Sequence, residues 1–227
     1  MTTEPGTHAY GATALGAPAL DAPATLSCPF GPLLIRYDAR VLQPRPWTLL
    51  QSRWAAELAA DAPDGPIVEL CAGAGHIGLA AAVLAGRDLV QVERDPIAAS
   101  YARMNAEAAG WGERADVRAA PLHDALRRDE SFPMMIADPP YLPTRQLVDW
   151  PNDPPTAIDG GLDGLGVTRA CLVVAADHLI TGGHLLLQTA GPVQSQTVVE
   201  LAHGLPLRPG ATRVFDDSRA VSQWIRL

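Results

Sequence analysis

The chain has 227 residues, 48% of them hydrophobic, and a formal net charge of −8, with every one of its 17 basic residues an arginine. This length and apolar content fit one domain with a sizeable buried core, and an acidic chain without a dense basic patch argues against a nucleic-acid partner. No uncharged apolar stretch reaches the roughly 18 residues that a membrane span needs. Cys28, Cys71 and Cys171 have no C-x-x-C spacing, so we expect no disulfide, no metal site and a cytoplasmic location.

The beginning of the chain, over 1–32, is rich in Ala, Pro, Gly and Thr. Such a segment buries too little apolar surface to offset its ordering entropy, so we expect a mobile leader there and a folded domain over 33–227. The segment has no Lys or Arg and no continuous apolar run, which argues against a signal peptide. A helix is then predicted over 48–60, where apolar residues recur mostly at three- and four-residue spacing.

Short apolar strands and helical segments alternate through the rest of the chain, a pattern typical of a parallel sheet covered on both faces. The end of the chain differs, because two short β runs separated by a turn predict an antiparallel hairpin at the sheet edge. The sequence therefore predicts an α/β, Rossmann-like fold with a seven-stranded, mostly parallel sheet. The expected strands are 66–70, 88–92, 116–118, 134–137, 184–188, 212–215 and 221–227, and the expected helices are 75–84, 96–109 and 167–180.

A glycine-rich turn follows the first parallel strand, where residues 68–79 read VELCAGAGHIGL. Its G-x-G-x-x-G pattern fits a nicotinamide dehydrogenase and also other nucleotide-binding folds, so it does not identify the ligand. Glu69 near the strand end would repel a pyrophosphate but would favour the ammonium group of a methionine moiety. Glu93 ends the next strand and is placed to accept both ribose hydroxyls, a role common to both kinds of cofactor.

The sequence Asp138-Pro139-Pro140-Tyr141 follows the fourth parallel strand, at the edge where open α/β sheets bind ligands. Two prolines remove two amide donors and leave carbonyl oxygens free, while the tyrosine ring offers a flat stacking surface. This combination predicts a pocket of acceptors beside an aromatic ring, suited to a planar nitrogen that bears hydrogen.

In chain order, the motifs P-R-P-x-T, E-L-x-x-G-x-G, V-E-R-D, D-P-P-Y and A-I-D-G-G-L-D-G-L resemble the class I methyltransferases of the HemK type. That family methylates a glutamine side-chain amide in translation release factors. The resemblance covers roughly 33–192 and implies S-adenosylmethionine as the cofactor and a methyltransferase domain over 33–227.

The residues and the resemblance together give a predicted site. The predicted cofactor contacts are Thr48, Glu69, Cys71, Gly73, Gly75, Glu93, Arg94 and His123. The predicted substrate contacts are Arg45, Trp47, Pro140, Trp150, Asp159 and Gly160. The predicted catalytic residues are Asp138, Pro139 and Tyr141.

The chain departs from the family pattern in four places. Cys71 stands where the family has its first glycine, so the turn there must tolerate a side chain. The acid that contacts adenine after the third strand is missing, and His123 or Asp124 is the available substitute. We expect no separate helical docking domain, because only about thirty residues precede the resemblance. The family's tetrapeptide begins with Asn, and this chain has Asp138 there.

The change from Asn to Asp138 affects which acceptor the site can bind. An Asn side chain accepts from an amide N–H and donates to its oxygen, whereas an ionised Asp only accepts. We therefore expect an N-methyltransferase whose acceptor is a protein glutamine or a small metabolite with an amide or amino nitrogen. A methyltransferase acting on exocyclic amino groups of nucleobases is the enzymatic alternative, and a non-catalytic cofactor-binding module is the alternative of another class. A nicotinamide dehydrogenase is supported by the glycine pattern alone.

Simpler interpretations stand beside several of these assignments. Glu69 could be a solvated strand end, and Gly73 and Gly75 could be ordinary turn glycines. Thr48 could belong to a helix entry, and Asp159 with Gly160 could form an ordinary loop. The sequence carries no signal for an oligomeric state.

Overall fold

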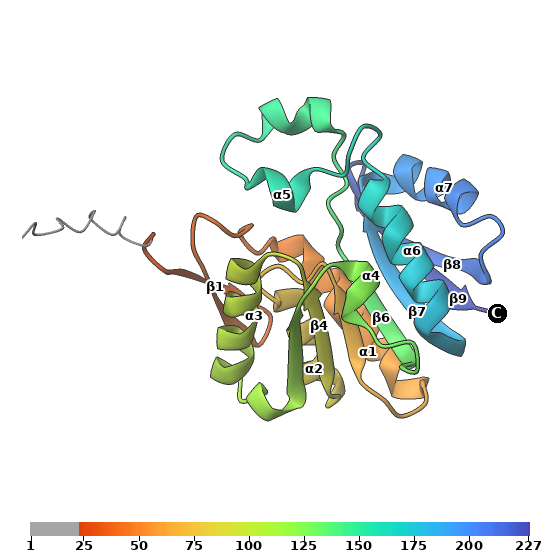
Figure 1. Ribbon diagram of the computed structural model, residues 1–227, viewed down its shortest axis with the longest axis horizontal. Helices are drawn as coiled ribbons and strands as arrows, with labels where there is room; N and C mark the ends of the chain where they lie inside the picture. The colour runs from red at the N-terminus through yellow and green to blue at the C-terminus, as the bar shows by residue number, and fades with distance from the viewer. Residues whose placement is uncertain (1–22) are drawn as a thin grey trace, which may run out of the picture.

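A seven-stranded sheet forms the centre of the computed structural model, which describes residues 23–227 (Figure 1). Its strand order is β5-β4-β3-β6-β7-β9-β8, parallel from β5 to β7 and antiparallel for the last two strands. The strands are β3 (Ile67–Leu70), β4 (Leu89–Glu93), β5 (Ala115–Ala119), β6 (Phe132–Ala137), β7 (Leu179–Thr189), β8 (Leu207–Asp216) and β9 (Arg219–Arg226). This arrangement confirms the predicted α/β fold and its C-terminal hairpin.

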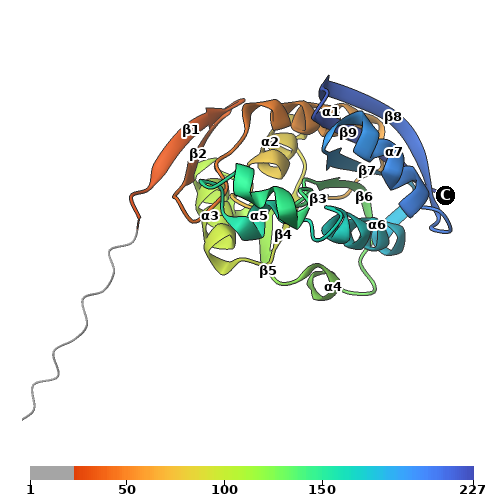
Figure 2. The ribbon, with the colours of Figure 1, turned by 90° about the horizontal axis from the view of Figure 1, so that it is seen from above.

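Helices cover both faces of the sheet, which is seen from above in Figure 2. The first face is covered by α1 (Leu49–Asp61), α2 (His76–Ala85) and α3 (Pro96–Ala108). The second is covered by α4 (Leu122–Ala125), α6 (Gly166–His178) and α7 (Gly191–Leu201). Successive side chains of a strand point to opposite faces. Ile67 of β3 accordingly belongs to the first apolar core, and Val68 and Leu70 belong to the second.

A small antiparallel hairpin of β1 (Leu26–Phe30) and β2 (Leu33–Tyr37) precedes the central sheet. Phe30, Ile35 and Tyr37 are buried in the first core, which gives the hairpin its apolar anchor. The leader predicted over 1–32 thus includes strand β1 in its last part, because Phe30 has a partner in the core that composition alone does not reveal. The rest of that prediction, over 1–22, lies outside the described residues.

Several elements were not predicted from the sequence. Helix α7 has a weak apolar pattern, and β7 begins at Leu179, five residues before the expected start at His184. The short elements α4, α5 (Pro155–Ile158) and the 3₁₀ helices η1 (Pro46–Thr48), η2 (Gly112–Arg114) and η3 (Thr144–Asp149) are also additions. Segments this short carry too few apolar positions for a periodicity to be read.

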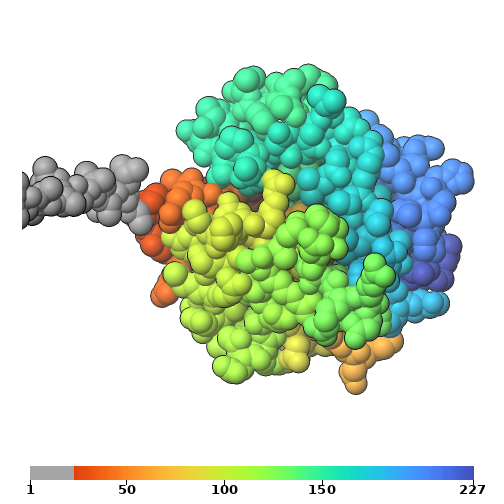
Figure 3. All heavy atoms as spheres, viewed as in Figure 1, coloured from red at the N-terminus to blue at the C-terminus, as the bar shows by residue number. Residues whose placement is uncertain are grey.

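The topology places two loops side by side at the carboxyl edge of the sheet. The chain runs outward from β3 through β4 to β5, then returns to add β6 on the other side of β3. This reversal makes the carboxyl ends of β3 and β6 a topological switch point, where open α/β sheets bind ligands. The segment with η3 and α5 rises above this edge as a separate lobe in the space-filling view (Figure 3). Within residues 23–227, no helix has the length and apolarity to cross a membrane.

Candidate functional site

The turn after β3 is built from residues with left-handed backbone. Cys71 has a φ of 58° and is the one residue other than glycine with positive φ in the described part of the chain; Gly73 and Gly75 have φ values of 55° and 80°. A side chain at Gly75 would lie 2.6 Å from Gln91 Nε2 and 2.9 Å from Ala102 Cβ, so only glycine fits there. An added Cβ at Gly73 would meet nothing within 4 Å. Gly73 therefore leaves open space where a ligand can approach the backbone.

Glu93 ties this turn to the end of β4. Its Oε2 accepts a hydrogen bond from the amide of Gly73 at 2.7 Å, and its Oε1 accepts one from the amide of Asp95 at 2.8 Å. Asp95 in turn caps α3 by accepting from the amides of Ile97 and Ala98. Each carboxylate oxygen has two lone pairs, so Glu93 can still accept from a ligand hydroxyl.

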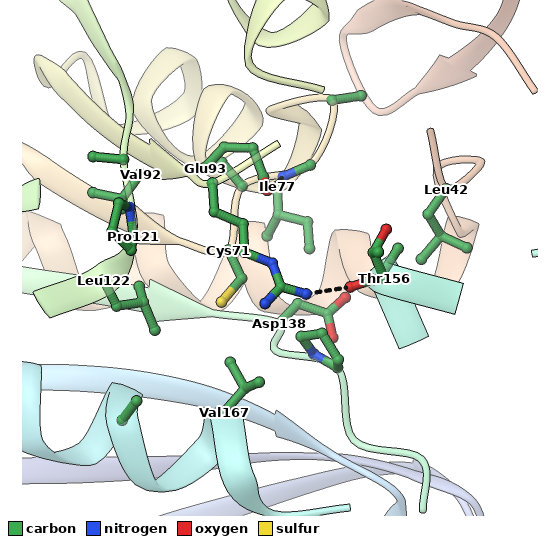
Figure 4. Close-up of a pocket in the computed structure, with 18 of the residues that line it drawn as sticks. Leu42, Cys71, Ile77, Val92, Glu93, Pro121, Leu122, Asp138, Thr156 and Val167 are labelled. Atoms are coloured by element: carbon green, nitrogen blue, oxygen red, sulfur yellow. Dashed lines mark hydrogen bonds between the residues drawn. The ribbon is translucent and has the colours of Figure 1, made fainter. Parts of the chain in front are cut away.

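A first cavity of about 350 Å³ opens beside this turn. The labelled side chains in Figure 4 surround it, with Pro121 and Leu122 at one end and Asp138 and Thr156 at the other. Its volume is within the range of sites that bury a small organic ligand. Among the predicted cofactor contacts, those that line this cavity are Cys71, Gly73, Glu93, Arg94 and His123.

Arg94 connects the two sides of the first cavity. Its Nη2 donates a hydrogen bond of 3.1 Å to the carbonyl of Thr156, at the start of α5 (Figure 4). The contact joins the end of β4 to the lobe above the sheet. Arg94 thus helps to hold that lobe over the cavity.

Asp138 lies where the first cavity meets a second one of about 300 Å³. Its side chain is partly buried and lines both cavities. Within residues 23–227 its carboxylate has no hydrogen-bond partner, and burial raises its pKa to about 7. A carboxylate at the junction of two cavities can therefore accept a hydrogen bond from a ligand that reaches it from either side.

The second cavity combines aromatic rings with paired charges. Tyr141, Trp47 and Trp150 line it together with Pro139 and Pro140. Burial is the main cause that raises the pKa of Tyr141 above its ordinary value, so its phenol stays neutral. Arg45 also lines this cavity and donates from Nη2 to both carboxylate oxygens of Asp153 at 2.6 Å. The predicted catalytic residues and four of the six predicted substrate contacts thus lie around one space.

Glu69 differs from the expectation that it faces the ligand. The side chain lies on the same face of β3 as Ile67, beneath α2, and is only 2% exposed. Its Oε2 accepts a 2.6 Å hydrogen bond from Gln91 Nε2, and a Cβ at Gly78 would lie 2.5 Å from it. Burial raises its pKa to about 8. Glu69 lines neither cavity, because strand alternation directs it into the helix layer.

Four more predicted residues line neither the first nor the second cavity. Gly75 packs against Gln91, and Thr48 is buried with its hydroxyl donating to the carbonyl of Arg45 at 2.8 Å. Asp159 accepts from the Thr144 hydroxyl and the Gly161 amide, and Gly160 donates its amide to the carbonyl of Leu142. The contacts of Thr48 are those of a residue at a helix entry, and the contacts of Asp159 and Gly160 are those of residues within a loop.

Other cavity residues were not among the predicted contacts, although Ala157 is the first residue of the A-I-D-G-G-L-D-G-L motif. Leu42 and Ala157 line both cavities. Arg219, at the start of β9, reaches the second cavity, and its Cζ lies 3.8 Å from the centre of the Trp47 ring. The sequence signal that could have indicated Arg219 is its position between the two predicted strands of the hairpin, 212–215 and 221–227.

Comparisons with known proteins identify relatives that match most of the chain, although no protein-family model matches it. The chain is 35% identical over 182 residues to the release factor glutamine methyltransferase of Mycolicibacterium smegmatis, a match that covers 77% of this chain and 63% of that protein. It is 31% identical over 205 residues to the release factor glutamine methyltransferase of Bradyrhizobium diazoefficiens, with 85% of this chain and 68% of that protein covered.

A solved structure agrees with the fold. The T. thermophilus 16S rRNA N2 G1207 methyltransferase, in complex with AdoMet and guanosine, superposes with a TM-score of 0.68 at 19% identity and covers 93% of this chain and 53% of that one. The chain spans about three fifths of the length of the first curated relatives that it matches. On the identity and coverage of these relatives, the chain belongs to the release factor glutamine methyltransferase family.

Proposed function

We propose that this chain is an S-adenosylmethionine-dependent N-methyltransferase that acts on an amide or amino nitrogen of a protein glutamine or a small metabolite. The observation that carries the proposal is the position of Asp138, whose carboxylate has no hydrogen-bond partner among residues 23–227 and lies where the two cavities meet. One cavity can then hold the methyl donor and the other the acceptor. Family membership supports the same activity.

The first cavity fits the proposed cofactor. Gly73 leaves space at the turn that an added Cβ would fill, and Glu93 keeps lone pairs for ribose hydroxyls. Ala120, Pro121 and Leu122 give an apolar wall after β5 on which a flat purine ring can pack. When bound, S-adenosylmethionine supplies a methyl group on a positively charged sulfur, which is an excellent leaving group.

Asp138 and Pro139 then orient the acceptor. The Asp138 carboxylate and the Pro139 carbonyl accept the two N–H groups of the nitrogen and direct its lone pair toward the first cavity. Methyl transfer would form a carbon–nitrogen bond, break the carbon–sulfur bond of the cofactor and release one N–H proton, and the acceptor oxygens would stabilise the positive charge that develops on the nitrogen more in the transition state than in the ground state. Tyr141 stacks on the acceptor plane, and its neutral phenol adds no competing charge.

A nucleobase amino group is the second candidate acceptor. It is favoured by the acid at position 138, because an exocyclic amino group needs acceptors and no donor. One similar structure is an rRNA N2 guanine methyltransferase with guanosine bound. The net charge of −8 speaks against a long nucleic-acid substrate.

The proposal is tested by measuring cofactor binding and turnover separately. Calorimetry with S-adenosylmethionine should show binding to the wild type and, within about threefold, to Asp138→Ala. The rate of methyl-label transfer from the cofactor to glutamine peptides and small aromatic amines should fall by about a hundredfold in that variant. This is the size of loss expected when one hydrogen-bond partner of the transition state is removed.

Asp64→Ala is the matched control, because Asp64 is fully exposed on a loop and lines neither cavity. It should retain wild-type binding and turnover. Absence of cofactor binding to the wild type would refute the proposal, and an unchanged rate in Asp138→Ala would remove Asp138 from the mechanism.

A further inference from the structure

Two arginines in the second cavity have hydrogen-bond donors to spare. Arg45 uses only Nη2, on Asp153, and Arg219 uses only Nη1, on Asp216 Oδ2 at 2.7 Å, among the contacts within residues 23–227. A guanidinium has five N–H donors in a planar fork. Both side chains line the second cavity and are about one quarter exposed, so their remaining donors are available to a ligand in it.

Trp47 holds both guanidinium groups in place. The Arg219 Cζ lies 3.8 Å from the centre of the Trp47 ring and the Arg45 Cζ lies 5.9 Å from it. Phe215 flanks the same ring at a centroid distance of 6.5 Å. Stacking on an aromatic face fixes the plane of a guanidinium and therefore the direction of its free N–H groups. The two arginines are far apart in the sequence, and both of their guanidinium groups lie near the Trp47 ring.

The charges of both arginines also act on Tyr141. The Tyr141 phenol has no hydrogen-bond partner among the described residues, and the positive charges of Arg219 and Arg45 lower its pKa against the larger effect of burial. The pKa of the same phenol is raised by the charge of Asp138. Asp138, Arg45, Arg219 and Tyr141 all line the second cavity, so an acceptor carboxylate and two guanidinium donors face the same space as this ring.

We infer that the acceptor of the second cavity is a small molecule that carries a carboxylate group in addition to the nitrogen that is methylated. This inference rests on the proposed function and specifies its substrate class. The N–H end of the acceptor meets Asp138, and its carboxylate meets the free donors of Arg219 and Arg45. Arg219 is then a residue that determines specificity, and it lies outside every motif of the family resemblance.

The charge balance and the size of the cavity favour a small carboxylate. Asp153 and Asp216 offset the two arginines, so recognition depends on hydrogen-bond geometry and suits one negative charge better than the two of a phosphate. The second cavity holds about 300 Å³, a volume that matches a small molecule. A planar guanidinium pairs with a carboxylate through two parallel hydrogen bonds.

Matched pairs of probes test the inference. Calorimetry in the presence of S-adenosylhomocysteine compares 4-aminobenzoate with 4-aminobenzamide, and N-acetylglutamine with N-acetylglutaminamide. In at least one pair the carboxylate should bind the wild type about tenfold more tightly than its neutral partner. Arg219→Gln should abolish that preference, so that the carboxylate and its neutral partner bind the variant with similar affinity. Arg45→Gln, as a second variant, should reduce the preference as well.

Arg213→Gln is the control for the arginine substitutions. Arg213 lies on β8, pairs with Glu57 and stacks on Trp54, away from both cavities. It should keep the wild-type preference for the carboxylate. Equal binding of both members in both pairs, or no binding of either carboxylate at millimolar concentration, overturns the inference. Binding of S-adenosylhomocysteine alone is measured first, so a failure of the proposed function is seen separately from a failure of this inference.

Discussion

The surroundings of Asp138 disfavour the ionised form of its carboxyl group. It is partly buried between two cavities and has no hydrogen-bond partner among residues 23–227. Burial without a partner disfavours the ionised form, which is why its pKa is raised to about 7. The side chain is consequently in a position to change its hydrogen-bonding capacity near neutral pH.

This environment predicts a pH-dependent acceptor. A raised pKa means that the carboxylate is mostly ionised, and accepts an N–H group without donating a proton itself, only above about pH 7. Turnover should therefore fall as the pH is lowered through that value. Carbon NMR of labelled aspartate should show a carboxyl resonance that titrates near pH 7 and is missing in Asp138→Asn. A midpoint below about pH 5 would contradict the assignment, since that is the range of an ordinary aspartate.

Alanine substitutions at two glycines of the same turn should have different effects, mainly on stability at Gly75 and mainly on cofactor binding at Gly73. Gly75→Ala adds a methyl group against Gln91 and Ala102 at a φ of 80°, so it should lower the free energy of unfolding. The loss should be about 3 kcal/mol, from left-handed strain and overpacking together. Gly73→Ala meets no protein atom within 4 Å, and its loss should stay at about 1–2 kcal/mol.

The same pair also separates folding from binding. The methyl group of Gly73→Ala enters the first cavity, so this variant should lose affinity for S-adenosylmethionine in calorimetry. Urea denaturation measures the stability of both variants. Equal losses of stability in the two variants would contradict the difference in packing between Gly73 and Gly75. Unchanged cofactor affinity in Gly73→Ala would show that the turn does not bind the ligand.

At the scale of elements, side chains rather than strand pairing fix the loops that carry the site. Gln51 of α1 donates from Nε2 to the carbonyls of Ala137 and Leu186 at 3.0 and 2.9 Å, and so holds the last residue of β6, next to Asp138. On the other side of the sheet, Arg118 of β5 pairs with Glu130, which precedes β6. The Gln51 contacts join segments that are 86 and 135 residues apart, whereas the Arg118–Glu130 pair joins β5 to the segment just before β6.

The Arg118–Glu130 pair predicts a pH-dependent contribution to stability. Two hydrogen bonds of 2.8 Å from Arg118 hold the pKa of Glu130 at about 2, below its ordinary value. A lowered pKa means that the ionised acid stabilises the fold at neutral pH, and that this stabilisation is lost as the pH falls from about 4.5 toward 2. Glu130→Gln should cost about 1–3 kcal/mol at pH 7.

Urea denaturation between pH 7 and pH 3 checks this prediction. The difference between Glu130→Gln and the wild type should shrink at the acidic end. Glu113→Gln is the control, because Glu113 is exposed in η2. A difference that stays constant over this pH range would show that the charge of Glu130 contributes nothing.

At the scale of the whole molecule, the acidic charge balance limits the partners that can bind tightly. The net charge is −8, and many arginines are paired with acids, as Arg40, Arg87, Arg114 and Arg169 are. A protein that binds a phosphate backbone needs a row of basic groups that are free to replace counterions. The arginines of the second cavity are two in number and flank a space of about 300 Å³.

We therefore predict weak, non-specific binding to single-stranded RNA at physiological salt. Fluorescence anisotropy with a labelled oligonucleotide should give a dissociation constant above about 10⁻⁵ M, within the range of non-specific binding. Tighter binding with a steep salt dependence would favour the nucleobase alternative over a small acceptor.

The sequence by itself determined the seven strands of the central sheet in chain order, the glycine-rich turn after the first of them and the C-terminal hairpin. These features follow from periodicity, glycine and proline, whose effects act over a few residues. The family resemblance rested on the same local motifs, and the relatives confirm it.

Only the tertiary structure decided which side chains share a cavity. In the structure Glu69 is buried under α2, and Asp159 and Gly160 make hydrogen bonds within a loop. Arg219 stacks on the ring of Trp47. Residues 47 and 219 meet because β9 pairs with β7, next to β6 at the centre of the sheet, a contact that no local pattern encodes. Side-chain direction at a strand end and the meeting of distant segments depend on sheet register and packing, and these are properties of the whole chain.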